Sequence, residues 1–355
     1  MSDRTHDQET MHGADALRVG LLGVAHLPHA LSYARCLAAS ANADLVGVYD
    51  NVADLAVTVA SRFDTPVHSE LSSLLDLQLD AVVVCSATDG HLDIVAQAAQ
   101  QGLHVLCEKP IATTVDDAQT MIDACAATGV QLHAAFVCRF YPFISQVRNA
   151  IQSGSIGQVV GMVGGNRGRP PLPPQYPDWI TDRTRAGGGA LIDHSVHVTD
   201  IMRFVSGQEA VRVNAEVDDR FWHAGVDDMA ALSVVFDGGA IASIDPSWSV
   251  PPDHPWDYDF FLQVLGTEGS LWVDDTTESI QLVSSEGGPG MRRVPFTADI
   301  DGLMIEAFLA SVRTGELIEP CASGLDGLRA LEIALAGYEA AALCESVTLT
   351  PTQRP

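Results

Sequence analysis

The sequence predicts an α/β protein of two domains: a doubly wound parallel sheet, then an α+β domain built on a large, mostly antiparallel open sheet. Three observations support this prediction. The chain has 355 residues, and at roughly 100–200 residues per domain this length favours two domains. Residues 17–136 alternate between short apolar runs and helical patterns, whereas strand patterns dominate after residue 140. We therefore expect a disordered tail (1–16), a first domain (17–140) and a second domain (141–355).

The first domain is predicted from its apolar runs and helix signals. Its strands are nearly continuous in apolar residues, as in parallel sheets that are covered on both faces. A capping-box-like pattern from Thr113 to Asp116 opens the last helix, and Gly129 ends it. We expect strands at 17–24, 44–50, 79–85, 104–107 and 130–136, and helices at about 28–40, 90–101 and 113–128, with another ending at 62.

The second domain begins with a helix, a strand and a long loop. Residues 167–189 hold five prolines, and loops of this length in compact domains are usually functional or disordered. Residues 211–217 alternate apolar and polar side chains, which is typical of a half-exposed strand. These patterns predict helices on one face of a mostly antiparallel sheet. We expect helices at 143–152, 189–206, 302–313 and 325–342, and strands at 158–166, 210–217, 229–236, 240–248, 258–265, 270–273 and 279–283.

The composition excludes several classes of function. The formal net charge is −27, and such a surface repels nucleic acid and anionic membranes. No apolar run approaches the roughly 20 residues of a membrane-spanning helix, and residues 1–15 lack the pattern of a signal peptide. The seven cysteines form no CxxC pair, which favours free thiols in a reducing compartment. We expect a cytoplasmic protein; a salty habitat and a high-GC genome explain its acidity equally well.

The turn after the first strand matches part of a dinucleotide-binding fingerprint, G-x-G-x-x-G. Gly23 can make the tight turn, but the second glycine is replaced by Ala25 and the third by Pro28. Pro28 is compatible with a first helical turn, where its missing amide donor is not needed. Asp50 ends the second strand, where a carboxylate accepts hydrogen bonds from ribose hydroxyls and repels a 2′-phosphate. We expect NAD rather than NADP; alternatively, Asp50 only caps the following helix.

Lys109 is the only lysine among the 19 lysine and arginine residues of the chain. It directly follows the predicted strand 104–107, and ligands of doubly wound folds bind beyond the carboxyl ends of the strands. Pro110 makes the chain rigid after it. An ammonium group held there can hydrogen-bond a substrate hydroxyl and stabilise developing alkoxide charge. The alternative is chance retention of one surface lysine.

A second candidate group follows the long loop and three consecutive glycines, 187–189. Asp193 and His197 stand four residues apart, so they share one face of a helix. A carboxylate beside an imidazole fixes its tautomer, which makes His197 a candidate general base with Asp193 as its orienting group. The alternatives are a surface Asp–His pair, or a metal site that includes His194. No third histidine or cysteine has a clear spacing for a metal.

Together these residues resemble the Gfo/Idh/MocA family, the glucose–fructose oxidoreductase and inositol dehydrogenase group. The most specific matches are Glu108-Lys109-Pro110 and the glycine-rich motif that runs from Gly187 through Asp193 to His197, and the resemblance spans residues 17–349. It implies a Rossmann domain beside an open-sheet domain that often mediates oligomerisation. It also implies oxidation or reduction of sugars and cyclic polyols, with Lys109, Asp193 and His197 at the catalytic positions.

The resemblance extends the candidate site through weaker matches at Ser86 with His91, at Arg139-Phe140 and at 266–270. Two sets of binding residues are expected in addition to the catalytic group. The cofactor set is Gly23, Ala25, His26, Asp50, Ser86, His91 and Glu108, and the substrate set is Arg139, Trp179, Arg183 and His194.

The resulting hypothesis is an oxidoreductase that moves a hydride between a sugar, glycoside or polyol carbon and NAD. His197 removes the hydroxyl proton, Asp193 orients His197, and Lys109 hydrogen-bonds the same oxygen. Two alternatives remain open: a glycosidase or lyase that uses transient oxidation with no net redox change, and a nicotinamide-binding sensor without catalysis. We expect homo-oligomers (dimer or tetramer) through the C-terminal sheet, and no metal, nucleic acid or membrane partner.

Overall fold

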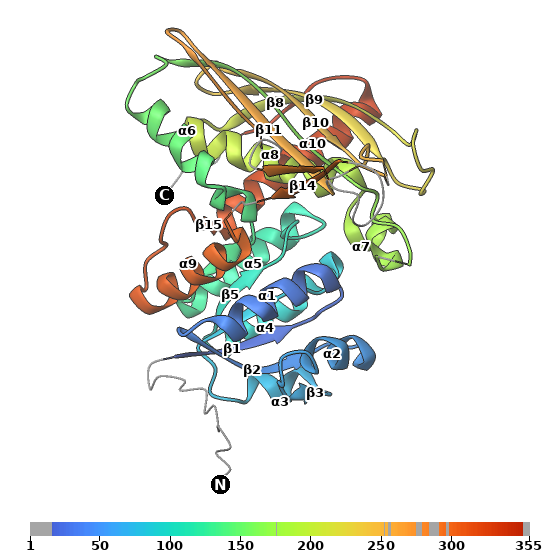
Figure 1. Ribbon diagram of the computed structural model, residues 1–355, viewed down its shortest axis with the longest axis vertical. Helices are drawn as coiled ribbons and strands as arrows, with labels where there is room; N and C mark the ends of the chain where they lie inside the picture. The colour runs from blue at the N-terminus through green and yellow to red at the C-terminus, as the bar shows by residue number, and fades with distance from the viewer. Residues whose placement is uncertain are drawn as a thin grey trace.

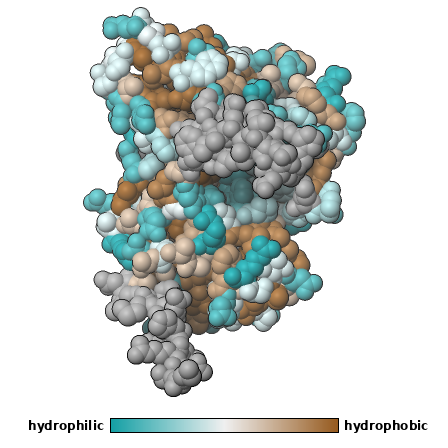
Figure 2. All heavy atoms as spheres, in the orientation of Figure 1, coloured by the Kyte–Doolittle hydropathy of each residue, from teal (hydrophilic) through white to brown (hydrophobic). Residues whose placement is uncertain are grey.

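The computed structural model has two lobes, which correspond to the parallel-sheet and open-sheet domains predicted above (Figure 1). It describes residues 16–174, 176–251, 253–254, 257–274, 279–283, 291–295 and 298–350, so the expected tail lies outside the described residues except for Ala16. On the face drawn in Figure 2, hydrophilic and apolar residues are interspersed over both lobes.

The first lobe contains a seven-stranded sheet that is parallel except for one edge strand. Its central strands are apolar and buried, as the continuous apolar runs predicted. The strands in spatial order are β15 (Ala322–Ser323), β6 (Leu132–Ala134), β5 (His104–Cys107), β4 (Ala81–Val84), β1 (Leu17–Leu22), β2 (Ala43–Tyr49) and β3 (Val67–His68).

Helices cover both faces of this sheet, which confirms the doubly wound arrangement. Gly129 ends α5 in a left-handed conformation, as expected, and the side chain of Thr114 rather than Thr113 caps its start. One face packs against α1 (Leu27–Ala39), α2 (Ala53–Ala60) and α9 (Ile300–Thr314), and the other against α3 (Leu71–Leu75), α4 (His91–Gln100) and α5 (Val115–Thr128).

The C-terminal part of the chain returns to the first lobe, which the expected boundary at residue 140 does not include. Met304 and Phe308 of α9 are buried in the same apolar cluster as residues of α1, and β15 pairs with β6. The apolar face of α9 needs a partner, and the open face of the parallel sheet beside α1 supplies it. Residues 300–323 therefore belong to the first lobe.

The second lobe is built on a seven-stranded sheet in which only the β7–β10 pair is parallel. This confirms a mostly antiparallel open sheet. Its spatial order is β12 (Ser270–Asp274), β11 (Tyr258–Gly266), β7 (Val159–Gly168), β10 (Ile241–Ser247), β9 (Met229–Phe236), β8 (Ala210–Asp218) and β16 (Val347–Thr348). A separate two-stranded ribbon consists of β13 (Ser279–Val283) and β14 (Met291–Pro295).

One face of this sheet packs against α8 (Ala190–Ser206) and α10 (Gly324–Leu343), with α6 (Pro142–Gln152) beside α8. In Figure 1 these helices lie between the sheet and the first lobe. The long loop contains short helical turns, η3 (Asp178–Thr181) and α7 (Arg183–Ala186), which the sequence pattern did not indicate. Two further turns are η1 (Thr88–Gly90) and η2 (Val137–Phe140). α8 thus brings its residues toward the carboxyl ends of the parallel strands.

Candidate active site

A first cavity of about 380 Å³ lies at the carboxyl ends of β1, β2 and β4, and we call it the cofactor pocket. Four of the residues expected to bind a cofactor line it together: Gly23, Ala25, Asp50 and Ser86. Its position beside the first strand of a doubly wound sheet is where nucleotides bind in such folds.

Gly23 cannot be replaced by a larger residue, because its backbone lies directly against the chain after β4. Its φ is +71°, and a Cβ at this position would be 2.5 Å from the Cβ of Ser86. Asp50 lines the pocket and also organises the backbone beside it, but it is not the cap of α2, whose N-cap Val52 has no side-chain hydrogen bond. Its carboxylate accepts hydrogen bonds from the amides of Val24 (2.6 Å) and Val52 (2.7 Å), which fix the turn after β1 and the start of α2.

Two residues expected to bind the cofactor lie beneath the pockets instead. His91 is buried, and its ring nitrogens contact the carbonyl oxygens of Ile111 (3.1 Å) and Ser86 (3.3 Å). Glu108 is also buried; Tyr33 Oη and the Lys109 amide donate to its carboxylate, and His29 Nδ1 lies 2.9 Å from it. Both expectations are corrected: these polar side chains hold the loops that carry Ser86 and Lys109.

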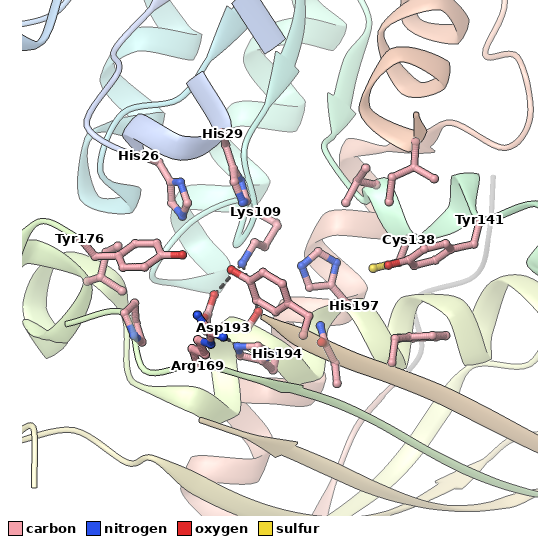
Figure 3. A pocket seen from close by; sticks show the side chains of 17 residues that line it. His26, His29, Lys109, Cys138, Tyr141, Arg169, Tyr176, Asp193, His194 and His197 are labelled. Atoms are coloured by element: carbon pink, nitrogen blue, oxygen red, sulfur yellow. Dashed lines mark hydrogen bonds and ion pairs between the residues drawn. The ribbon is translucent and has the colours of Figure 1, made fainter. Parts of the chain in front are cut away.

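A second cavity of about 200 Å³, the substrate pocket, lies between the lobes and contains Lys109, Asp193 and His197 (Figure 3). His194 also lines it, as expected. His26, which was expected at the cofactor, lines the substrate pocket together with His29 from the same helix start. Further lining residues are Asn166, Arg169, Tyr176, Tyr258 and Phe260.

Asp193 is the best connected residue of the substrate pocket. Its Oδ1 accepts from Lys109 Nζ at 2.6 Å, and its Oδ2 accepts from Trp248 Nε1 at 3.1 Å and lies 3.2 Å from His194 Nε2. No hydrogen bond joins Asp193 to His197 among the described residues, so the expected orienting pair is wrong. A buried ammonium group attracts a carboxylate more strongly than a neutral imidazole does, and Lys109 therefore takes the place of His197.

The charges of this pair are well defined. Burial opposes ionisation of both groups, yet the charges of Lys109 and His194 hold the pKa of Asp193 well below its ordinary value. Burial also opposes the charge of Lys109, but Asp193 and Glu108 raise its pKa above 10.5. Lys109 is therefore a hydrogen-bond donor at neutral pH and cannot act as a base.

His197 is a neutral acceptor in the same pocket. Burial, with the charges of Lys109 and His194, lowers its pKa well below 6.5. Its Nδ1 is buried without a hydrogen-bond partner, as are the Nδ1 atoms of His26 and His194. For His26, burial and the charge of His29 lower the pKa to about 3. The pocket therefore combines one fixed cation, Lys109, with two imidazoles whose pKa values are lowered, those of His26 and His197.

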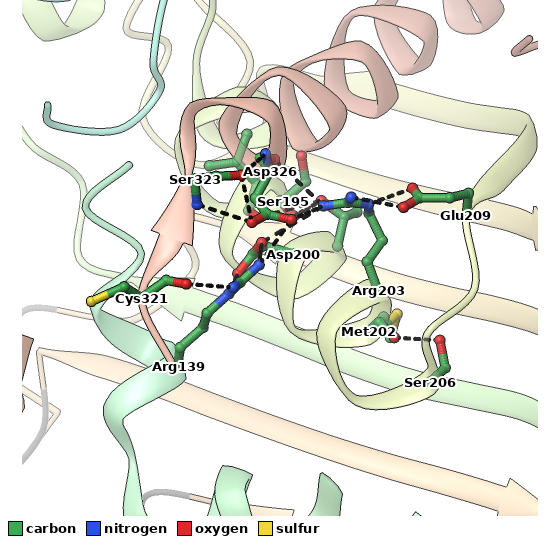
Figure 4. Close-up of polar contacts among 12 residues, drawn as sticks. Arg139, Ser195, Asp200, Met202, Arg203, Ser206, Glu209, Cys321, Ser323 and Asp326 are labelled. Carbon is green, nitrogen blue, oxygen red and sulfur yellow. Dashed lines mark hydrogen bonds and ion pairs between the residues drawn. The ribbon is translucent and has the colours of Figure 1, made fainter. Parts of the chain in front are cut away.

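Arg139 does not reach the substrate pocket, which corrects its expected role. Its Nε and Nη2 both donate to Asp200 at 2.6 Å, and Nη1 donates to the carbonyl of Cys321 (Figure 4). Asp326 lies within 3.3 Å of the same guanidinium group. The reason is charge compensation: Asp200 on α8 is fully buried, and its carboxylate needs a buried cation. Arg139 thus connects the end of the first domain with α8 and α10.

Trp179 and Arg183, from the long loop, also lie outside the substrate pocket. The Trp179 ring is buried against Ala87, and its Nε1 donates to the carbonyl of Ala25 at 3.2 Å. It lines a narrow gap between the two pockets together with His26 and Lys109. Arg183 is exposed and stacks on the ring of Tyr338. The length of the loop indicates a functional segment, but the assignment of Trp179 and Arg183 to the substrate is corrected, because both side chains have partners far away in the chain.

Comparisons with known proteins agree with the predicted resemblance. Residues 17–136 match the family model "Oxidoreductase family, NAD-binding Rossmann fold", and residues 144–272 match the GFO/IDH/MocA C-terminal domain. Myo-inositol 2-dehydrogenase of Thermotoga maritima is 31% identical over 276 residues, which cover 75% of this chain and 77% of that protein. The chain belongs to the Gfo/Idh/MocA family of oxidoreductases.

Other relatives cover nearly the whole of this Gfo/Idh/MocA chain. Inositol 2-dehydrogenase of Rhizobium meliloti is 29% identical over 92% of this chain and 97% of its own length. The crystal structure of GenD2 from gentamicin A biosynthesis, in complex with NAD, superposes with a TM-score of 0.86 over 95% of this chain and 97% of its own. At 23% identity the latter shows the common fold.

The cofactor pocket of this NAD-binding oxidoreductase fits a dinucleotide in three respects. Gly23 leaves the turn after β1 without a side chain where the backbone must come close to a ligand. The start of α1 carries no side-chain cap and no acidic residue in its first turn, so its partial positive charge is available to an anion. Asp50 ends β2, where a ribose is expected.

Within the part of the chain that the structure describes, no three histidine, cysteine, aspartate or glutamate side chains converge as metal ligands would. None of its helices is both long and apolar enough to cross a bilayer. The seven cysteines are free thiols, and all except Cys344 are buried.

Proposed function

We propose that the protein is an NAD-dependent dehydrogenase of a cyclic polyol, sugar or glycoside, with Lys109, Asp193 and His197 as its catalytic group. The observation that supports this most directly is the 2.6 Å ion pair between Lys109 and Asp193 in one pocket with His197. Its named relatives include inositol 2-dehydrogenases, which makes an inositol or a related ring polyol the first substrate class to test.

The two pockets and the gap between them form a path of the kind that a dinucleotide requires. Ala25 and Ala87 line the cofactor pocket, and their chain neighbours His26 and Thr88 line the gap. His26 and Lys109 are shared by the gap and the substrate pocket. The adenosine end of a bound cofactor would therefore lie at Asp50 and its nicotinamide end near Lys109. Bound NAD supplies the hydride acceptor.

In the proposed mechanism, Lys109 donates a hydrogen bond to the substrate oxygen and stabilises its developing negative charge. His197, which is neutral, accepts the hydroxyl proton as the C–O bond becomes a carbonyl, and it returns this proton in the reverse direction. Asp193 acts on Lys109 rather than on His197: it keeps the ammonium group charged and fixes its direction. Trp248 and His194 in turn hold Asp193.

Two other functions use the same scaffold. A glycosidase or lyase would oxidise its substrate transiently and turn over without releasing free NADH, so NADH release during turnover distinguishes it from a dehydrogenase. A sensor would bind nicotinamide without catalysis, and it would not need the buried Lys109–Asp193 pair beside His197. We favour the dehydrogenase for this reason.

Three further features belong to the proposal. NAD is preferred over NADP, because the Asp50 carboxylate repels a 2′-phosphate. The chain forms homo-oligomers through the face of the second sheet that carries no helices. The location is cytoplasmic, which remains a prediction from composition.

Reduction of NAD with a panel of inositols, sugars and glycosides tests the dehydrogenase directly. With an active substrate, we expect Lys109→Met to lower kcat by at least about 10²-fold, the usual effect of losing one preorganised donor at a developing oxyanion. NAD binding, followed by tryptophan fluorescence, should stay measurable. Because the substitution leaves Asp193 without its cation, thermal unfolding of the variant must also be recorded.

Arg183→Met is a suitable control, since it removes an exposed cation that lines none of the three cavities. It should retain full turnover. If Lys109→Met folds, binds NAD and turns over at the wild-type rate, the catalytic assignment is refuted.

A further inference from the structure

Among the described residues of the second lobe, Arg185 is the one that lines the cofactor pocket. It belongs to the short helix α7, and its Nε donates to Asp89 Oδ2 of η1 at 3.2 Å. The Arg185 side chain is 44% exposed, and that of Asp89 is 40% exposed. Solvent screens the two charges, so the ion pair is weak and Arg185 can leave Asp89 for another anion.

The charges of the cofactor pocket favour a move of Arg185 from Asp89 to a bound phosphate. Its lining residues include three carboxylates, Asp50, Asp89 and Asp93, and Arg185 is the single lysine or arginine among them. A dinucleotide carries a doubly charged pyrophosphate into this acidic pocket. Without a cation near the phosphates, their desolvation would be compensated only by backbone amides.

The turn after β1 departs from the full fingerprint, because Ala25 adds a methyl group where a second glycine would allow close approach to the pyrophosphate. Pro28, in the first turn of α1, has no amide hydrogen to donate to a phosphate. We propose that Arg185 binds the cofactor pyrophosphate from the second lobe, leaving Asp89 when the dinucleotide enters.

The position of α7 favours the pyrophosphate over the adenosine 2′ position. Ala186, next to Arg185, is buried in the same small cluster as Ala87 and Trp179, and Ala25 packs against this cluster. Trp179 is also hydrogen-bonded to the carbonyl of Ala25. Arg185 is thus anchored beside the turn after β1, which faces the phosphates in doubly wound folds. The 2′-hydroxyl is expected at Asp50, after β2.

The inference rests on NAD binding by the family and not on the proposed dehydrogenase chemistry. Binding of ADP-ribose and of adenosine to the full-length protein therefore tests it without a substrate. Isothermal titration should show that Arg185→Gln weakens ADP-ribose binding by about three- to tenfold, as expected for a partly exposed charge-assisted contact. Adenosine, which has no phosphate, should bind equally well to both proteins. The loss should shrink as salt is raised.

Arg183→Gln is the matched control, because Arg183 is a cation of the same helix that stacks on Tyr338 and does not line the cofactor pocket. It should leave ADP-ribose affinity unchanged. Asp89→Asn should tighten ADP-ribose binding, because it removes the anion that competes for Arg185 and repels the phosphates. Arg185→Lys should restore part of the affinity.

Three outcomes would overturn the proposal. The first is equal weakening of ADP-ribose and adenosine by Arg185→Gln, or no weakening of either. The second is weaker binding of ADP-ribose to Asp89→Asn. The third is a loss confined to NADP, with NAD unaffected, which would place Arg185 at the 2′-phosphate instead. A protein that binds ADP-ribose as proposed but oxidises no polyol would leave this inference intact and contradict only the proposed function.

Discussion

At the scale of single residues, the buried charges of the substrate pocket determine how activity depends on pH. Protonation of His197 would remove the proton acceptor, but burial and the charge of Lys109 lower its pKa well below 6.5. The loss of activity on acidification therefore lies below pH 6.5 and not above it. Lys109 has a raised pKa, so it stays charged beyond pH 10.5.

We therefore expect kcat/KM to be nearly constant from about pH 8 to about pH 6, because this ratio reports groups of the free enzyme. Initial rates at saturating NAD and low substrate, in buffers of constant ionic strength, provide the measurement. An acidic decline with its midpoint at or above pH 6.5 would mean that an ordinary exposed histidine is the base. His197→Gln should abolish the activity and, with it, the decline of kcat/KM at acidic pH.

A second prediction at this scale concerns cofactor choice. Asp50→Asn keeps an oxygen that can accept from Val24 or Val52 but removes the negative charge. We expect the preference for NAD over NADP, measured as the ratio of the two kcat/KM values, to fall by about tenfold or more. The variant should lose some affinity for both cofactors, since one turn contact is weakened. An unchanged ratio would show that Asp50 only organises the turn.

The sequence predicted which residues meet in the substrate pocket better than how they pair. Lys109 follows a parallel strand and His197 lies on the helix after the glycines, and both positions are local properties. The partner of Asp193 is not local. Helix spacing allowed an Asp193–His197 pair. The carboxylate instead accepts hydrogen bonds from Lys109, 84 residues earlier, and from Trp248, 55 residues later. Arg139 was misassigned for the same reason, because its partner Asp200 is 61 residues away.

At the scale of elements, the glycines before α8 fix the helix that carries the catalytic group. They allow a close approach of groups from the protein itself. A Cβ on Gly188 would lie 2.0 Å from Tyr338 Oη, and one on Gly189 would lie 2.0 Å from the carbonyl oxygen of Asp227. The Asp227 carboxylate accepts from the amides of Gly189 and Leu191 and from Tyr338 Oη. The start of α8 is thus held from two sides.

We expect Gly189→Ala to lower the free energy of unfolding by about 1–3 kcal/mol, because backbone at Asp227 must move to make room. kcat should fall as well, since a shift of α8 displaces Asp193 and His197 together. Gly269→Ala is the control: its nearest neighbour would be a side-chain methyl at 3.3 Å, far from the pockets. Thermal unfolding and turnover measure the two effects. Equal stability of both variants would contradict the tight packing described here.

At this scale the sequence predicted most helices and strands, because periodicity and caps are local signals. It missed β15 and the return of α9 to the first lobe, since a two-residue strand has no pattern and the covering of a sheet face depends on distant partners. It also left α7 within a loop. Four residues give no helical periodicity, although the Asp182 side chain caps this turn.

At the scale of the whole molecule, the face of the second sheet opposite α8 and α10 exposes large apolar side chains beside polar ones. Ile241 is 58% exposed and Trp272 is 64% exposed, and Val163 and Leu265 are also exposed. Strand register places these side chains on one face. Trp272 pairs with Gln263, and Gln263 pairs with Val163. Ile241 pairs with Gly161, which lies two residues before Val163 and so on the same face. Exposed large apolar side chains on one face of a sheet are typical of interaction sites. A second copy of the chain would cover this face symmetrically.

We therefore expect Ile241→Glu to shift the protein from an oligomer to the mass of one chain, because it places a charge among the exposed apolar side chains of the proposed interface. Light scattering coupled to size-exclusion chromatography, at micromolar protein, measures the change. Val57→Glu is the control, since Val57 is an apolar residue of α2 with 51% exposure that lies in the other lobe. Both substitutions add one surface charge, so a difference between them reports position and not charge. Two results would contradict this interface: a wild-type protein that elutes at the mass of one chain, or a Val57→Glu variant that dissociates as much as Ile241→Glu. In either case the apolar side chains of the sheet face require another partner.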